Sequence, residues 1–226
     1  RLGESPSVSL RLGELDHLAA CGVFHTGAVG HCPVSGFAAH DLVGPDLVAH
    51  LVARSLAERP DTVIGLSHPE RGMAVNRDLP DSAIADLGVE PGSLRPFAEA
   101  RVDAACKLTL WTDDLQPLDD LAEHLLAGAG GGIDCHLADG GTCLLITRHG
   151  VSKASMLLRL LAHLDLDPAH CAGIGDDITD VPFLHLVGRP IAIAGGHPAA
   201  LASTDTHVPP PHEGGWARAV DLLLDG

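Results

Sequence analysis

Three aspartates lie within five positions after a short apolar segment, in the string Gly173-Ile-Gly-Asp-Asp-Ile-Thr-Asp180. Carboxylates this close repel one another, so the pattern indicates a cation between them. Ligands of open α/β sheets bind beyond the carboxyl ends of strands, and this loop leaves a strand expected at 170–174. Asp176 and Asp180 suit a hard cation such as Mg²⁺, which takes a few carboxylates plus substrate phosphate, and Asp177 is a further candidate ligand.

A second interpretation of this loop needs no metal. Asp177 or Asp180 could simply cap the helix expected after the loop, since aspartate is a favoured N-cap residue. Glycines at positions 173 and 175 would allow the tight backbone turn in either case. Taken alone, the loop leaves both interpretations open.

Lys153 favours the metal and phosphate interpretation. The chain contains two lysines, Lys107 and Lys153, so arginine is its default surface cation. Lys153 is expected at the start of a helix, about twenty residues ahead of the acidic loop. A compact ammonium group serves well as a point charge on a phosphate. The alternative is a solvated lysine on the helix surface, but its pairing with the acidic loop favours a phosphate contact.

The elements that must position these residues alternate between strand and helix after Gly150. Short connections between alternating strands and helices predict a parallel, doubly wound α/β layer. Ser152 is a plausible N-cap for the first of the helices. We expect helices at 152–164, 180–187, 198–203 and 213–224, and strands at 170–174, 190–194 and 207–208.

The middle of the chain has a different character, and residues 44–148 read as an α+β module. Ala138-Asp-Gly-Gly141 between two apolar segments is a hairpin signal. Ahead of the module, residues 18–30 predict a short buried strand followed by a glycine turn. The module is expected to contain helices at 44–58 and 117–127, and strands at 62–66, 73–76, 103–111, 133–137 and 142–147.

Composition excludes several classes of protein. The 226 residues suffice for one large domain or two small ones, and the hydrophobic fraction of 46% allows a sizeable core. Fourteen Lys and Arg against 30 Asp and Glu give a net charge of −16, which argues against a nucleic-acid partner and indicates a solvated acidic surface. No apolar run reaches about 18 residues and no signal peptide is visible, so no membrane association is expected. The six cysteines are scattered without zinc-site spacing, which predicts reduced thiols and a cytoplasmic location.

Several segments together resemble a known family. His149-Gly-Val-Ser-Lys-Ala154, followed by a helix and then Gly173–Asp180, looks like the third and fourth signature motifs of haloacid dehalogenase-like phosphatases. More narrowly, the chain resembles subfamily IIB, whose members carry a C2B cap. That subfamily includes Cof-type sugar phosphatases and the mannosyl-3-phosphoglycerate and trehalose-phosphate phosphatases. The segments Arg189–Ala194 and His212–Val220 resemble its usual C-terminal end, and Thr26-Gly-Ala28 its early "N-G-A" turn.

The resemblance implies an α/β fold, with a Rossmann-like core whose parallel sheet is N-terminally incomplete and an inserted α+β cap domain. Residues 1–43 and 149–226 would form the core, and 44–148 the cap. It also implies a Mg²⁺-dependent phosphohydrolase that acts on a small phosphorylated metabolite, such as a sugar phosphate, through an aspartyl-phosphate. Lys153 would neutralise the nucleophile and the phosphoryl oxygens. Asp176, with Asp180 behind it and Asp177 beside it, would hold the Mg²⁺.

The chain departs from the family pattern at its first two motifs. Asp-x-Asp-Gly-Thr, which would supply the nucleophile, is absent from the 226 residues, as is the Ser or Thr of the second motif. Asp165-Leu-Asp167 reads as a turn at a helix end, and Asp113-Asp114 lies in the presumed cap. Our interpretation is that the chain begins just after motif II, without the first strand and its nucleophile. A core shortened in this way would leave a sheet edge uncovered and favour a homodimer.

Two hypotheses about function therefore stand. Either the chain is part of a phosphatase, or it is a non-catalytic α/β module such as a pseudoenzyme or interaction protein. Without a nucleophile, the 226-residue chain is predicted to have negligible phosphatase activity. An Asp-x-Asp after an apolar strand in the upstream reading frame would discriminate in favour of the enzyme. No cap residue identifies the leaving group; Arg71, Arg77 and Arg101 could meet an anionic substrate, although surface positions are the simpler interpretation.

Overall fold

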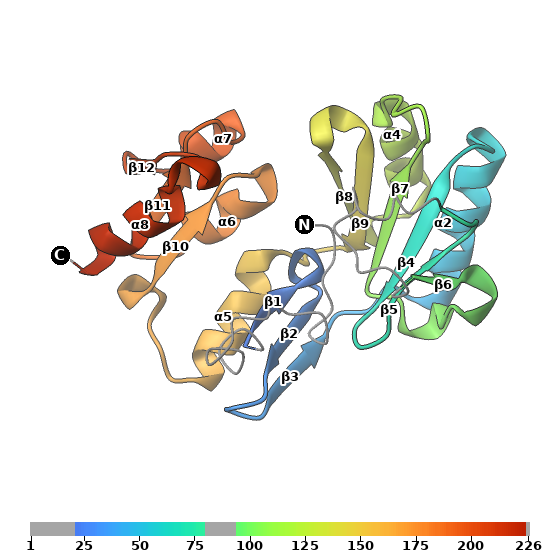
Figure 1. Cartoon of the computed structure of the whole chain (residues 1–226). Coiled ribbons are helices and arrows are strands. Elements are labelled where there is room, and N and C mark those ends of the chain that lie inside the picture. The colour runs from blue at the N-terminus through green and yellow to red at the C-terminus, as the bar shows by residue number, and fades with distance from the viewer. Residues whose placement is uncertain (1–20, 80–93, 225–226) are drawn as a thin grey trace. The chain divides into compact units, whose positions relative to one another are not determined.

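The structure, a computed structural model, describes residues 21–79 and 94–224 of the chain (Figure 1). The chain divides into two compact units, Arg1–Val151 and Ser152–Gly226. Each unit has sheets and helices of its own. None of the helices within the described ranges combines the length and the apolar character needed to cross a membrane.

A six-stranded mixed sheet dominates the first unit. Its strand order is β6-β5-β4-β7-β9-β8, and every neighbouring pair is antiparallel except β5 and β6. Strands β8 and β9 form the hairpin predicted from the sequence, with Ala138 opposite Cys143 next to the turn. The strands are β4 (Val63–His68), β5 (Gly72–Val75), β6 (Leu94–Pro96), β7 (Lys107–Trp111), β8 (Ile133–Ala138) and β9 (Cys143–Arg148).

Helices α2 (Pro45–Glu58) and α4 (Asp119–Gly128) cover one face of this sheet (Figure 1). Alternate residues of a strand point to opposite faces, so Leu108 and Leu110 of β7 face the helices. They join one apolar cluster with Leu51 of α2 and Leu121 of α4. This cluster is the main core of the unit, and it leaves the intervening residues of β7 on the opposite face.

A second, smaller sheet in the same unit comprises β1 (Gly22–Phe24), β2 (Val29–Cys32) and β3 (Phe37–His40). The three strands pair antiparallel in sequence order. A 3-10 turn at His25–Gly27 joins β1 to β2, where both His25 and Thr26 adopt positive φ. The strand and turn expected at 18–30 are present as β1 and the turn at His25–Gly27, but β1 is half-buried rather than buried and a second strand begins at Val29. Residues 18–20 lie outside the described ranges.

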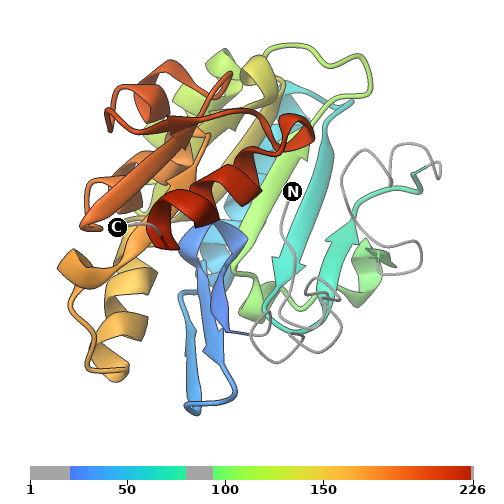
Figure 2. The same ribbon diagram turned by 60° about the vertical axis from the view of Figure 1, so that its left-hand side comes forward.

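The second unit holds the predicted parallel layer. Strands β10 (Ala172–Gly175), β11 (Arg189–Ile193) and β12 (His207–Val208) pair in parallel and in that order. Ala219 of α8 packs against Ile191 and Val208 of the sheet, and Figure 2 shows this C-terminal helix in red. The helices are α5 (Lys153–His163), α6 (Val181–Leu184), α7 (Pro198–Leu201) and α8 (Gly215–Leu224).

Most element predictions are confirmed, with shifts at the ends. The segment expected to be helical over 180–187 is a 3-10 turn at Ile178–Asp180 followed by the single-turn helix α6. The strand expected at 170–174 begins at Ala172, because Pro168–His170 forms a 3-10 turn. Strands β2, β3 and β6 were not predicted; all three are short, and none has a strong apolar alternation.

Candidate functional site

The acidic loop lies where the sequence predicted it. Strand β10 ends at Gly175, and Asp176 is the first residue beyond its carboxyl end. A 3-10 turn, Ile178–Asp180, follows at once and leads into α6. In a parallel sheet this edge is the usual place for ligands, so the local topology suits a binding site.

Asp180 anchors the loop from within. Its side chain is buried, and its Oδ2 accepts hydrogen bonds from the backbone N–H groups of Asp176 (2.9 Å) and Asp177 (3.0 Å). Its Oδ1 forms an ion pair with Nζ of Lys153. Both carboxylate oxygens are therefore engaged by the protein itself, which suits a positioning role more than that of a free metal ligand.

Asp177 forms the capping arrangement that the sequence left open. Its Oδ1 accepts from the backbone N–H of Ile178 (2.7 Å), and its Oδ2 accepts from the hydroxyl of Thr179 (2.9 Å). With Asp180 it completes a capping box at the 3-10 turn. The Asp177 carboxylate thus stabilises the loop backbone.

Asp176 is the exposed carboxylate of the three. Within the described part of the chain, its side chain makes no hydrogen bond or ion pair, while its backbone carbonyl accepts from the N–H of His197 (2.7 Å). Partial shielding of the carboxyl from water raises the pKa of Asp176, and the negative charges of Asp180 and Asp177 raise it further. A carboxylate in such surroundings gains from a nearby cation.

Lys153 supplies positive charge to the same loop. It is the first residue of α5, whose start is fixed by a capping box between Ser152 and Ser155. The Ser152 hydroxyl accepts from the N–H of Ser155 (3.0 Å), and the Ser155 hydroxyl accepts from the N–H of Ser152 (2.9 Å). The Lys153 side chain is 35% exposed, so its ammonium group can meet a ligand while paired with Asp180. Its charge also acts on Asp176, whose pKa it lowers against the larger effects described above.

Two glycines allow the backbone to pack tightly around the loop. A Cβ atom at Gly175 would lie 2.6 Å from Cβ of Asp180. One at Gly196 would lie 2.5 Å from the backbone oxygen of Asp176. Both distances are below any normal contact, so these positions require glycine if the loop is to keep this geometry.

The loop offers one carboxylate, that of Asp176, which is suited to a hard cation such as Mg²⁺. Mg²⁺ is held by hard oxygen ligands and is often bound through one or two carboxylates, with water and phosphate completing the shell. Asp176 offers such a carboxylate, whereas Asp177 and Asp180 are engaged with the protein. Among residues 21–79 and 94–224, no three His, Cys, Asp or Glu side chains are grouped so as to hold a metal ion.

A polar patch on the first unit was not predicted. Lys107 and Thr109 lie on the face of β7 that points away from α2 and α4, and Lys107 is only 1% exposed. On β9, Thr147 lies beside Lys107 in the sheet register. The buried hydroxyls of Thr109 and Thr147 have no hydrogen-bond partner among the described atoms. Alternation along β7 places Lys107 on this face, but the sequence alone could not show that it is buried.

The arginines considered from the sequence have other contacts. Arg77 forms an ion pair with Asp113 (2.9 Å), and Arg101 binds both carboxylate oxygens of Asp103. Arg71 offers its backbone carbonyl to the guanidinium of Arg95 (3.2 Å). The paired arginines support the surface interpretation over a role in binding substrate.

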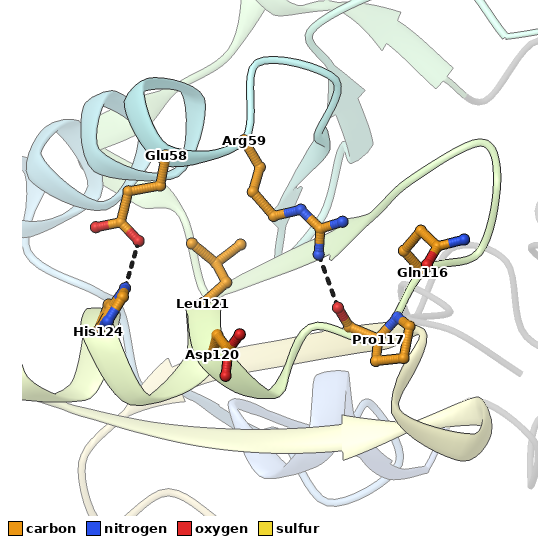
Figure 3. Close-up of a pocket in the computed structure, with 7 residues that line it drawn as sticks. All are labelled: Glu58, Arg59, Gln116, Pro117, Asp120, Leu121 and His124. Atoms are coloured by element: carbon orange, nitrogen blue, oxygen red, sulfur yellow. Dashed lines mark hydrogen bonds and ion pairs between the residues drawn. The ribbon is translucent and has the colours of Figure 1, made fainter.

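A pocket of about 630 Å³ lies between the end of α2 and the start of α4, and it has a different character (Figure 3). Two of its polar side chains, His124 and Arg59, are held by other residues of its lining. Nδ1 of His124 hydrogen-bonds Glu58 (2.7 Å), and Arg59 donates to the carbonyl of Pro117 (2.7 Å). The hydrogen bond from His124 and the nearby Arg54 lower the pKa of Glu58. With its cations already paired, this pocket is a poorer phosphate site than the loop after β10.

Comparison with known proteins decides the family. The model of the haloacid dehalogenase-like hydrolases matches residues 95–220, more than half of the chain, and that range includes Lys153 and the whole acidic loop. The chain belongs to the haloacid dehalogenase-like hydrolase family. The resemblance stated from the motifs is thereby confirmed.

Two curated relatives bear the same name. A phosphoglycolate phosphatase of Haloarcula marismortui is 32% identical over 110 residues, which are 49% of this chain and 46% of the relative. A phosphoglycolate phosphatase of Methanothrix thermoacetophila is 27% identical over 87 residues, or 38% of this chain and 39% of the relative. The matched segments span less than half the length of either relative.

Solved structures share the fold over most of this haloacid dehalogenase-like hydrolase. A subclass IIB sugar phosphatase superposes with a TM-score of 0.74 and 14% identity, covering 97% of this chain and 82% of its own. A haloacid dehalogenase-like hydrolase from Bacteroides thetaiotaomicron gives a TM-score of 0.72 and 16% identity, covering 88% and 74% of the two chains. The predicted fold class, an α/β core with a parallel sheet plus a cap domain, is confirmed.

Proposed function

We propose that this protein is a Mg²⁺-dependent phosphomonoesterase, or the part of one that binds metal and phosphate. The observation that carries the proposal is the Lys153 ammonium held by the buried Asp180 beside the exposed Asp176, at the carboxyl end of a parallel strand. Membership of a hydrolase family and the names of the curated relatives support it.

The three site residues then have separate roles. Lys153 contacts the phosphoryl oxygens and offsets their charge. Asp176 is the carboxylate that binds Mg²⁺, while Asp180 orients both Lys153 and the loop backbone. Bound Mg²⁺ would neutralise charge that develops on the transferred phosphoryl group. Asp177, which the sequence made a possible ligand, holds the 3-10 turn in this proposal.

We assign residues 44–148 to the cap, and 1–43 and 149–226 to the core. The continuous α+β arrangement from α2 to β9 supports the cap assignment, and the parallel β10-β11-β12 layer supports the core assignment. Phosphoglycolate, the substrate in the relatives' names, is the first phosphorylated metabolite to test, ahead of a sugar phosphate.

The second candidate is a non-catalytic module of the same fold. The 226 residues contain no Asp-x-Asp-Gly-Thr motif, and that observation favours this candidate for the chain as given. Both candidates predict negligible turnover by the chain alone, so activity of the chain does not separate them.

Assays on two proteins test the proposal. With Mg²⁺, the product of the complete reading frame should hydrolyse p-nitrophenyl phosphate and, faster, phosphoglycolate, and Asp176→Ala should abolish both activities. The 226-residue chain should show no turnover above a buffer control. Turnover by the 226-residue chain that Asp176→Ala removes would refute the predicted inactivity. A complete product with neither turnover nor affinity for phosphate would favour the non-catalytic module.

A further inference from the structure

Cys21 and Cys32 face each other across two antiparallel strands of the first unit. In the β1–β2 register Gly22 pairs with His31, and one step further along the ladder Cys21 lies opposite Cys32. Residues directly opposite in an antiparallel pair have Cα atoms about 4.5–5.5 Å apart. That separation lies within the range of about 4.4–6.8 Å that a disulfide requires. The two thiols already share a hydrogen bond.

Cys32 ends strand β2 and begins a turn that Ser35 closes. The hydroxyl of Ser35 donates to the Cys32 carbonyl (3.3 Å), and hydrogen bonding with Cys21, Ser35 and Val34 lowers the pKa of the Cys32 thiol. The turn is also closed by a backbone hydrogen bond from Ser35 N–H to the Cys32 carbonyl (3.2 Å). Hydrogen bonding of this kind favours the thiolate form of Cys32.

The environments of the two sulfurs shift the pKa values of the two thiols in opposite directions. The hydrogen bonds from Cys21 and Ser35 lower the pKa of Cys32, whereas desolvation and the bond to Cys32 raise the pKa of Cys21. Cys21 therefore stays protonated as the donor of the pair. Redox-sensing cysteines combine a lowered thiol pKa with access to the oxidant, and often with a neighbouring resolving cysteine; this pair has the first and the last of these features.

The other cysteines with resolved pKa shifts contrast with Cys32. Burial raises the pKa of Cys106, Cys135 and Cys143 to about 12 in each case. Thiols of this kind are inert toward oxidants at neutral pH, because the thiolate is the nucleophile. Cys171 is part-exposed, and its thiol is directed to the carbonyl of Asp167 (3.5 Å). Cys171 is therefore the natural comparison in a test of selectivity.

We propose that Cys32 and Cys21 form a peroxide-reactive thiol pair, with Cys32 as the attacking thiolate and Cys21 as the resolving thiol. Cys32 is only 6% exposed, so a small oxidant such as hydrogen peroxide reaches it more readily than a bulky disulfide. The site lies on the β1–β2 hairpin and is independent of the acidic loop. Cys21 and Cys32 have no role in the proposed phosphatase activity, so the two proposals can be tested separately.

The chemistry balances with one peroxide. The Cys32 thiolate attacks one oxygen of hydrogen peroxide; the S–O bond forms, the O–O bond breaks, and hydroxide leaves, giving the sulfenic acid of Cys32. The Cys21 thiol then loses its proton and attacks the sulfur of Cys32. The S–S bond forms and the S–O bond breaks, releasing the second oxygen as water. Two thiols are oxidised to one disulfide, and one peroxide is reduced to two waters.

Peroxide treatment of the reduced 226-residue chain, followed by mass spectrometry of non-reduced peptides, tests this proposal. The expected product is 2 Da lighter and contains a peptide pair linked through Cys21 and Cys32. Cys21→Ser should still react rapidly but stop at a sulfenic acid, which dimedone traps at Cys32. Cys32→Ser should lose the fast reaction, and Ser35→Ala should slow it about two- to tenfold, as loss of one hydrogen bond to the thiolate predicts.

Cys171→Ser is the matched control and should react like the unchanged chain, with circular dichroism confirming that every variant is folded. A disulfide that links any other cysteines, or equal rates in the unchanged chain and Cys32→Ser, would overturn the proposal. So would dimedone labelling of Cys171 ahead of Cys32 in Cys21→Ser. Because Ser35→Ala keeps both cysteines, its rate decides the question even if a cysteine variant fails to fold.

Discussion

At the scale of single residues, the three aspartates after β10 carry the same carboxylate but differ in their contacts. Asp180 is 5% exposed and joins two backbone N–H groups to Lys153, whereas Asp176 is exposed with its carboxylate available to a ligand. Sequence reasoning placed all three in one candidate metal site, with Asp177 as the less certain ligand, and left open whether Asp177 or Asp180 instead caps the following helix. Burial and hydrogen-bond direction distinguish them, and both depend on how the chain packs.

This distinction predicts opposite consequences for two substitutions. Asp180→Ala should lower the free energy of unfolding by about 2 kcal/mol, because it leaves two part-buried N–H groups and the Lys153 ammonium group without their partner. Asp176→Asn should change that free energy by no more than about 0.5 kcal/mol, as is usual for an exposed side chain. Urea unfolding followed by circular dichroism measures both. Equal losses of stability in the two variants would contradict the separate roles.

His25 makes a second prediction at this scale. It is 3% exposed, and its ring nitrogens lack hydrogen-bond partners within the described ranges. Burial lowers the pKa of His25 to about 3, with a smaller effect from the charge of Lys107. The unfolded chain takes up a proton at this histidine below about pH 6.5 while the folded chain does not, so stability present above pH 6.5 is lost as the pH falls toward 3.

The loss attributable to His25 should reach about 2 kcal/mol at pH 5. His25→Asn, chosen because asparagine tolerates the positive φ of this position, should flatten the pH dependence of stability between pH 7 and 5. His212→Gln, which alters an exposed histidine, should leave the dependence unchanged. If His25→Asn and the unchanged chain lose the same amount of stability between pH 7 and 5, the buried neutral His25 is not the source of the pH dependence.

At the scale of elements, the helices and strands of the second unit could be predicted from short sequence patterns such as helix caps and apolar runs. Ser152 ahead of an apolar helical pattern gave α5, and apolar runs bounded by glycine or proline gave β10 and β11. In the first unit the hairpin turn at 138–141 was equally clear. Strands β2, β3 and β6 were not predicted, because their pairing depends on neighbouring strands in the sheet, which a single segment does not reveal. The burial of Lys107 was not predicted for the same reason: it depends on the strands and side chains that pack around β7.

The cap of α5 matters for function because the helix begins with Lys153. Ser152→Ala removes one side of the capping box and should lower the free energy of unfolding by about 1 kcal/mol. Ser152→Asp supplies an equivalent acceptor and should retain most of that stability. Thermal unfolding of the two variants makes the comparison. A greater loss with aspartate than with alanine would show that capping is not what Ser152 contributes.

Gly196 links the turn after β11 to the loop after β10. In Gly196→Ala the new Cβ would meet the Asp176 carbonyl oxygen, which cannot move without the loop backbone. The variant should lose about 1–3 kcal/mol of stability and should also bind Mg²⁺ and phosphate more weakly. Gly44→Ala is a suitable control, because no atom lies within 4 Å of its new Cβ. Unimpaired ligand binding by Gly196→Ala would show that the loop tolerates displacement.

At the scale of the whole molecule, the two units differ in what the sequence revealed. The second unit holds the contiguous motifs of a haloacid dehalogenase-like hydrolase, so its role could be inferred from a few residues. The first unit depends on a six-stranded sheet whose order, β6-β5-β4-β7-β9-β8, is set by long-range pairing. The proposed phosphate and metal contacts, Lys153 and Asp176, both lie in the second unit.

Isothermal titration calorimetry of the 226-residue chain with inorganic phosphate, with and without Mg²⁺, tests the proposed roles of Lys153 and Asp176 most directly. The account predicts that Mg²⁺ tightens phosphate binding, that Asp176→Asn removes the effect of Mg²⁺, and that Lys153→Met weakens binding about tenfold or more in either condition. Arg77→Met is the control, because Arg77 is already paired with Asp113 and belongs to the first unit. This variant should bind phosphate as the unchanged chain does. Phosphate binding that is indifferent to Mg²⁺, to Asp176→Asn and to Lys153→Met would contradict the account.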